Sequence, residues 1–217
     1  MASMTRRLAL AAFAALAMFV APASAEWSEW DAASELGWSL GDADAPLTVI
    51  EYFSPTCSHC KEFEEDVMPA VKKDYIETGK VRFVKREYIR NDVDTAIVSV
   101  ARCLGGETGL AFLGDVFARQ DDIFAAASAG TVPDTLVEIG QPHGLADRAA
   151  FDTCYADMNI RFDMVAVQQS ASHYRIHATP TFVVGGTVKA ASTDIMTSEG
   201  FSAFLDAELA KVPPVTN

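Results

Sequence analysis

Segments typical of β-strands lie towards the two ends of this sequence and not in its long middle, which restricts the fold more than any other feature. Residues 47–53 (LTVIEYF) and 81–89 (VRFVKREYI) are rich in β-branched and aromatic side chains. Residues 91–176 are alanine-rich with helical periodicity, and they predict four or five helices and no strand. Because a few strands at one end make an incomplete layer, we expect both ends to contribute to one sheet.

The segments around these strands predict how the sheet is connected. Apolar residues follow one another at helical spacing over residues 58–78, where Pro69 is expected to kink the helix. Strand, helix and strand in this order are typical of a parallel pair. Residues 179–190 (TPTFVVGGTVKA) contain two apolar runs joined by two glycines, which is typical of a β-hairpin. Residues 198–211 predict a last helix.

The sequence therefore predicts one α/β domain that is interrupted by a helical insertion. Residues 26–90 and 177–217 are assigned to the α/β domain, and residues 91–176 to an inserted all-helical domain. An insertion is favoured over two tandem domains because both parts of the α/β domain are incomplete on their own.

The first 25 residues are typical of a secretory signal peptide. Arg6 and Arg7 precede an apolar run from Leu8 to Val20, and an Ala-x-Ala sequence ends at Ala25. This run is shorter than the ~20 apolar residues that a membrane-spanning helix needs. We therefore expect cleavage near Ala25 and export of the mature chain.

Charge and cysteine content narrow the function classes. Removal of the first 25 residues takes away two arginines and no acid, which leaves 15 basic and 30 acidic residues and a net charge of −15. Binding of nucleic acid needs a basic face, so no nucleic acid partner is expected. The mature chain keeps four cysteines, and an even number favours disulfides after export. Spacing favours pairing Cys57 with Cys60 and Cys103 with Cys154.

Cys57 and Cys60 lie where a strand is expected to pass into a helix. The free amide groups and positive dipole at a helix start stabilise an anion, so the pKa of the Cys57 thiol should fall. Cys60, one turn further along, should be more buried and should act as the second thiol that closes the disulfide. His59 adds a second donor or cation beside the sulfur. A thiolate stabilised in this way makes the disulfide a strong oxidant.

A structural disulfide and a metal site are the alternatives to redox chemistry at this cysteine pair. Tetrahedral zinc usually needs a second ligand pair at short spacing, and neither Cys103 nor Cys154 has a cysteine or histidine two to four residues away. Only folding could bring His143, His173 or His177 close to the pair. The pattern favours redox chemistry and predicts no metal and no other cofactor.

The segments APLTVIEYFSPTCSHCKEF and ATPTFVV, on either side of the helical block, resemble the DsbA-type periplasmic thiol:disulfide oxidoreductases. These are thioredoxin-fold proteins with an inserted helical domain, and the resemblance extends from about Gly41 to Ala210. It implies a periplasmic enzyme that donates the Cys57–Cys60 disulfide to folding exported proteins. It also implies reoxidation by a DsbB-type membrane quinone reductase.

The resemblance implies roles for residues outside the cysteine pair. Pro180 matches a proline that is cis in the family and faces the disulfide, where Thr179 pairs with an extended substrate chain. Glu51 matches an acid that lies beneath the disulfide and helps to move the proton of the buried thiol, with Lys85 as its expected partner. The simpler alternatives are a proline that begins a strand and a charge on a half-exposed strand.

Two departures from the family pattern leave the direction of the reaction open. Ser58 stands where the best-known members have proline, and Thr179 stands where typical oxidases often have valine. A disulfide isomerase or reductase is therefore the main alternative, and a metal-binding thioredoxin-like module is an alternative from another class. Isomerases of this kind are usually dimers held by an N-terminal domain. No such module is visible in this sequence, so a monomer is expected.

Cys103 and Cys154 both lie in the helical block, in segments of helical periodicity. A bond between them would stabilise the fold by about 4 kcal/mol through the entropy of the unfolded chain. Such a bond is similar to the extra, non-catalytic disulfide of some family members. Two buried free thiols, or a relay partner for the first pair, are the alternatives. If the bond is structural, the redox role belongs to Cys57 and Cys60 alone.

Overall fold

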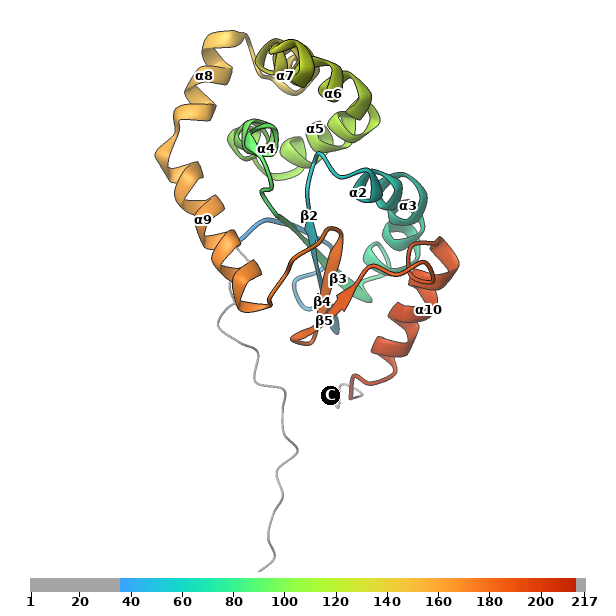
Figure 1. Ribbon diagram of the computed structural model, residues 1–217. Helices are drawn as coiled ribbons and strands as arrows, with labels where there is room; N and C mark the ends of the chain where they lie inside the picture. Colours follow the sequence, from blue (N-terminus) through green and yellow to red (C-terminus); the bar gives the residue numbers. More distant parts are fainter. Residues whose placement is uncertain (1–35, 214–217) are drawn as a thin grey trace, which may run out of the picture.

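The computed structural model describes residues 36–213 of the chain (Figure 1). The signal peptide and the cleavage site near Ala25 that the sequence predicts lie outside the described residues. Within the described part, no helix is both long enough and apolar enough to cross a membrane.

A mixed five-stranded sheet in the order β1-β3-β2-β4-β5 lies at the centre of the structure. Its strands are β1 (Trp38–Leu40), β2 (Leu47–Phe53), β3 (Val81–Glu87), β4 (Thr181–Val184) and β5 (Thr187–Ala190). β2 and β3 pair in parallel, and all other neighbours pair antiparallel. The predicted parallel pair therefore forms the middle of the sheet, and the predicted hairpin extends it. The sequence does not predict β1, because three residues are too few to show an alternating pattern.

The hairpin turn between β4 and β5 depends on two glycines. Gly185 and Gly186 both have positive φ, at 54° and 75°. Two-residue hairpin loops of this kind need positive φ at both positions, where a side chain would be strained. The glycine pair that signals the hairpin in the sequence is thus the feature that makes the turn possible.

Six α-helices and one 3₁₀ turn lie between β3 and β4. They are α4 (Asp92–Leu104), α5 (Gly106–Ala118), α6 (Gln120–Ala129), α7 (Val132–Gly140), the 3₁₀ turn Gln141–His143, α8 (Arg148–Ala156) and α9 (Met158–His173). The sequence prediction of four or five helices is therefore wrong. The additional boundaries are at Arg119 and Asp157, where neither glycine nor proline marks a break. Asp157 is an N-cap that accepts a hydrogen bond of 2.8 Å from the amide of Asn159.

Different helices cover the two faces of the sheet (Figure 1). One face carries α2 (Ser58–Glu62), a π-helical turn (Phe63–Val67), α3 (Met68–Val71), a second π-helical turn (Lys72–Ile76) and α10 (Ser198–Leu209). The other face packs against α9. The two π-helical turns flank α3, whose residue Pro69 has no N–H to donate. The helix is therefore irregular on both sides of Pro69, and the kink that the sequence predicts there stays a prediction.

Besides the apolar contacts on the two faces of the sheet, a separate apolar cluster lies inside the helical block and continues beneath the segment between β2 and α2. It contains Phe53, Cys57 and Cys60 together with buried side chains of α4 to α9. The block and the sheet therefore meet at the cysteine pair. This architecture is the α/β thioredoxin fold with an inserted all-helical domain that the sequence predicts. The domain boundaries near residues 90 and 177 stay a prediction.

Candidate active site

Cys57 is the N-cap residue of α2, directly after the turn that follows β2. Its backbone is extended, with φ −97° and ψ 121°, and its carbonyl accepts a hydrogen bond of 3.1 Å from the amide of Cys60. Both cysteines are buried free thiols. Ser58 and His59, between them, are exposed. The helix start predicted from the sequence thus has one thiol at the beginning of its first turn, Cys57, and one at the end of that turn, Cys60.

The two thiols have pKa values shifted in opposite directions. A hydrogen bond from Cys60 is the largest cause that lowers the pKa of Cys57 to about 5, and it outweighs the opposing effect of burial. Burial raises the pKa of Cys60 well above its usual range, and its hydrogen bond to Cys57 acts in the same direction. At neutral pH the reduced pair is therefore one thiolate and one thiol.

The loop before β4 contacts Cys57 from the other side. The Cys57 thiol donates a hydrogen bond of 3.3 Å to the carbonyl of Thr179, and the Thr179–Pro180 peptide bond is cis. Thr179 Oγ1 is buried and has no hydrogen-bond partner among the described residues. The proximity of this side chain, as a donor to the thiolate, is one of the causes that lower the pKa of Cys57. The carbonyl of Thr179 thus accepts a hydrogen bond from the thiol form of Cys57. Its hydroxyl has no other partner in the described part of the chain and is positioned to donate to the thiolate form.

Glu51, Lys85 and Glu64 form a cluster of charges behind the cysteine pair. Glu51 and Lys85 are register partners on β2 and β3, and only 1% and 2% of their surfaces are exposed. Lys85 Nζ lies 3.3 Å from Glu51 Oε2 and forms a second ion pair with Glu64. Burial raises the pKa of Glu51 to about 7 in spite of the charge of Lys85. Burial acts to lower the pKa of Lys85, but the charges of Glu51 and Glu64 outweigh it and raise this pKa.

Sequence reasoning missed Glu64, although one signal was present. Glu64 follows Cys60 by four residues, and this spacing puts two side chains on the same face of a helix. Sequence reasoning also missed Arg90, whose charge helps to lower the pKa of Cys57. The His59 ring, expected to act as that cation, forms no hydrogen bond or ion pair with the other residues in the described range 36–213. No short spacing links Arg90 to Cys57, so only the folded chain reveals it.

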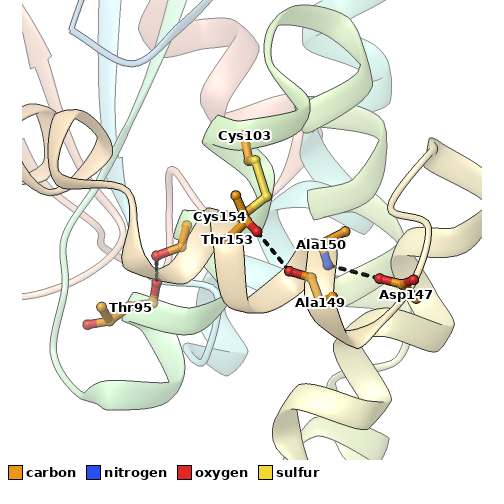
Figure 2. The surroundings of a disulfide bond; sticks show 8 residues. Thr95, Cys103, Asp147, Ala149, Ala150, Thr153 and Cys154 are labelled. Atoms are coloured by element: carbon orange, nitrogen blue, oxygen red, sulfur yellow. Dashed lines mark hydrogen bonds between the residues drawn. A yellow bond between two sulfur atoms is a disulfide. The ribbon is translucent and has the colours of Figure 1, made fainter.

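Cys103 in α4 and Cys154 in α8 are joined by a disulfide within the helical block (Figure 2). Their Cα atoms are 5.6 Å apart. Asp147 caps the start of α8 by accepting a hydrogen bond of 2.9 Å from the amide of Ala150. The disulfide between Cys103 and Cys154 connects α4, the first helix of the block, to α8, the helix before α9.

The histidines considered as metal ligands do not gather around the cysteine pair. His143 Nε2 instead lies 2.7 Å from the carboxylate of Asp115. Among residues 36–213, no group of three or more histidine, cysteine, aspartate or glutamate side chains is arranged to hold a metal ion.

Comparison with known proteins identifies related chains. The Thioredoxin family model matches residues 34–207. A Rickettsia bellii protein named as a protein-disulfide oxidoreductase is 31% identical over 150 residues, which cover 68% of this chain and 56% of the relative. Disulfide bond formation protein D of Bacillus subtilis is 46% identical over 44 residues, 20% of each chain. This chain spans about half the length of the Rickettsia relatives that it matches.

Solved structures share the fold. Wolbachia pipientis alpha-DsbA1 superposes with a TM-score of 0.68 at 24% identity, over 83% of this chain and 97% of the other. Oxidised BdbD from Bacillus subtilis superposes with a TM-score of 0.68 at 19% identity, over 81% of this chain and 94% of the other. These matches confirm that the fold resembles that of DsbA-type proteins, as the sequence predicts. Since the family model covers most of its length, the chain belongs to the thioredoxin family.

Proposed function

We propose that this protein is an exported thiol:disulfide oxidoreductase that donates a Cys57–Cys60 disulfide to folding proteins. The observation that carries the proposal is the opposite shift of the two thiol pKa values, with Cys57 lowered to about 5 and Cys60 raised. A stabilised thiolate favours the reduced form of the pair, and this makes the disulfide form oxidising.

In the first step of exchange, a substrate thiolate attacks the Cys57 sulfur of the oxidised protein. A bond forms between the substrate sulfur and Cys57, the Cys57–Cys60 bond breaks, and Cys60 leaves as a thiolate that takes up a proton. We assign the donation of this proton to Glu51. Its pKa of about 7 and the electrostatic effect of its charge on Cys60 support this role.

In the second step, another substrate thiolate attacks the substrate sulfur that is bonded to Cys57. The substrate disulfide forms and Cys57 leaves as the stabilised thiolate, so two electrons have passed from the substrate to the cysteine pair. A thiolate of low pKa is a good leaving group, which favours release of the product. Thr179 and the cis bond to Pro180 support a role of this loop in pairing with an extended substrate chain.

The exchange itself needs no cofactor, because both electrons move between sulfur atoms. Repeated turnover needs a reoxidant, and the family resemblance suggests a DsbB-type membrane quinone reductase. A periplasmic location and a monomeric state belong to the same proposal. Ser58 and His59 are exposed beside Cys57, a position suited to contact with substrate or reoxidant.

The test is the reduction potential of the mature protein after equilibration in glutathione buffers, with mass spectrometry to show which cysteines respond. A potential above about −200 mV confined to Cys57 and Cys60 supports the oxidase. A potential near or below about −270 mV, the range of reducing thioredoxins, overturns it in favour of a reductase.

The alternatives predict other results in the same preparations. An isomerase would form a stable dimer, rest in the reduced state, and fail to be reoxidised by a membrane oxidase. A metal-binding module would retain stoichiometric copper or zinc through dialysis, and would lose it on the Cys57→Ser and Cys60→Ser substitutions.

A further inference from the structure

The turn that leads into Cys57 is held by a buried carboxylate of the helical block. Asp94, in the first turn of α4, has no exposed surface. Its Oδ1 accepts hydrogen bonds from Ser54 Oγ at 2.9 Å, from the Thr56 amide at 3.1 Å and from Thr56 Oγ1 at 2.8 Å. Its Oδ2 accepts from Ser54 Oγ at 3.0 Å and from the Arg90 amide at 2.9 Å. One carboxylate therefore binds both ends of the Ser54–Thr56 turn.

A second helix of the block holds the same turn by its carbonyl groups. Gln120, the first residue of α6, is only 3% exposed. Its Nε2 donates hydrogen bonds to the carbonyls of Pro55 at 2.9 Å and of Cys57 at 3.2 Å. Because Asp94 and Gln120 come from different helices, together they fix the direction in which the turn presents Cys57 as well as its position.

Arg90 connects this contact to the charge of the site. Its Nε donates to Ser54 Oγ at 3.1 Å and its Nη2 donates to the Thr56 carbonyl at 3.1 Å. Its Nε also lies 4.0 Å from Asp94 Oδ2. The groups that favour the Cys57 thiolate are Cys60, Thr179 and Arg90. The charged groups behind the pair are Glu51, Lys85 and Glu64. Arg90 is the one cation among the groups that favour the thiolate, and its position depends on the turn and on Asp94.

Helix capping alone does not account for Asp94. Asn91 already caps α4, since its Oδ1 accepts a hydrogen bond of 2.9 Å from the Asp94 amide. A capping partner at Asp94 would need one oxygen, whereas four of the five hydrogen bonds that its carboxylate accepts come from Ser54 and Thr56. A buried carboxylate is unfavourable unless hydrogen bonds compensate it, and here the turn supplies most of them.

We propose that Asp94 and Gln120 are positioning residues through which the inserted helical domain sets the reactivity of Cys57. They hold the turn and Arg90 in the geometry that stabilises the thiolate. The inference rests on the proposed function only in taking Cys57 as the reactive thiol. It assigns to the helical block a part in the chemistry of a sulfur that belongs to the other domain.

The test is the rate of Cys57 alkylation by iodoacetamide as a function of pH in reduced full-length mature protein. In Asp94→Asn, one oxygen becomes an NH₂ group that faces the N–H of Arg90 or Thr56, so the turn loses its arrangement. We expect the rate at pH 6 to fall about tenfold relative to the limiting rate at high pH, because less thiolate is present. The reduction potential should become more reducing in parallel.

Asp92→Asn is the matched control, because Asp92 lies in the same helical turn and is exposed. Its alkylation profile should stay within about twofold of the unsubstituted protein. Gln120→Met keeps the volume of the side chain and removes both donors, and about a threefold fall at pH 6 is expected from loss of these hydrogen bonds.

Circular dichroism and thermal unfolding show whether each variant is folded. If Asp94→Asn does not fold, the alkylation profile of Gln120→Met tests the inference. Folded variants with an unchanged alkylation profile and potential would overturn the inference. Alkylation needs no protein substrate, so the result is separate from the proposed function. A shifted profile in a protein that oxidises no substrate would support the positioning role and reject the oxidase.

Discussion

Cys57 and Cys60 lie at one strand-to-helix turn and are free, whereas Cys103 and Cys154 are 51 residues apart and bonded. In the loop-closure model, a bond within the short segment gains about 2 kcal/mol and the longer ring gains about 4 kcal/mol. The first pair also has a thiolate stabilised by its neighbours, which favours reduction. A bond between two cysteine sulfurs is thus labile in one pair and lasting in the other. The difference follows from the size of the ring that the bond closes and from the groups that surround the reduced thiols.

The first prediction separates the two pairs by removing the reactive thiol. Cys57→Ser should lower the rate of substrate oxidation by at least about 1000-fold, because serine cannot form the mixed disulfide. Relative to the oxidised protein, the free energy of unfolding should fall only by the gain of the short ring, about 2 kcal/mol, since the second disulfide stays closed. The measurement is oxidation of a reduced, unfolded protein substrate. Retention of a tenth of the activity would show that another cysteine can act as the nucleophile.

The second prediction reverses the change. The double variant Cys103→Ala, Cys154→Ala should lose about 4 kcal/mol of the free energy of unfolding, measured with urea while the first pair is held oxidised. Its exchange rate should stay within about threefold, because no step of the proposed reaction uses this bond. A large loss of exchange with little loss of stability would instead indicate a relay between the two pairs.

Much of this contrast could be predicted from the sequence, because its signals are local. The strand before Cys57, the helix after Cys60 and the glycine pair of the hairpin each depend on a few neighbouring residues. The resemblance implied the Thr179–Pro180 loop, and the structure has that loop in contact with Cys57. Thus the reactive pair and its immediate neighbours could be found without coordinates.

The supporting residues could not be found in that way, because folding brings them together from distant parts of the chain. Asp94 and Gln120 have no spacing that relates them to Cys57, and each could equally be a surface residue of a helix. Strand β1 is too short for a pattern, and the helix boundary at Arg119 has no glycine or proline. Long-range hydrogen bonds are therefore the part of this site that sequence patterns leave out.

The third prediction concerns the proton of the buried thiol. In Glu51→Gln the acid is lost, so we expect opening of the oxidised pair by a substrate thiolate to slow roughly tenfold at pH 6. Glu51, with a pKa of about 7, is mostly protonated below that pH and mostly ionised above it. The difference between the two proteins should therefore shrink towards pH 9. Stopped-flow exchange with a small thiol measures it.

Glu65→Gln is the control for this change, because Glu65 is exposed and pairs only with Lys61 in the described part of the chain. It should leave the pH profile unchanged. A Glu51→Gln profile parallel to that of the unsubstituted protein at every pH would show that Glu51 acts on structure and not on the proton.

The fourth prediction tests the thiolate itself through the pH dependence of the reduction potential. The folded pKa of Cys57 is lowered to about 5, so its thiolate stabilises the reduced protein above that pH, and this stabilisation is lost as the pH falls through 5. Between about pH 5.5 and 8 reduction should take up one proton for two electrons, which gives a slope of about 30 mV per pH unit. Below pH 5 the slope should approach about 59 mV, as two protons are then bound. Repeating the titration in Glu51→Gln removes the second group that titrates in this range. A slope of about 59 mV throughout would mean that Cys57 is an ordinary thiol, and ring size alone would then distinguish the two pairs.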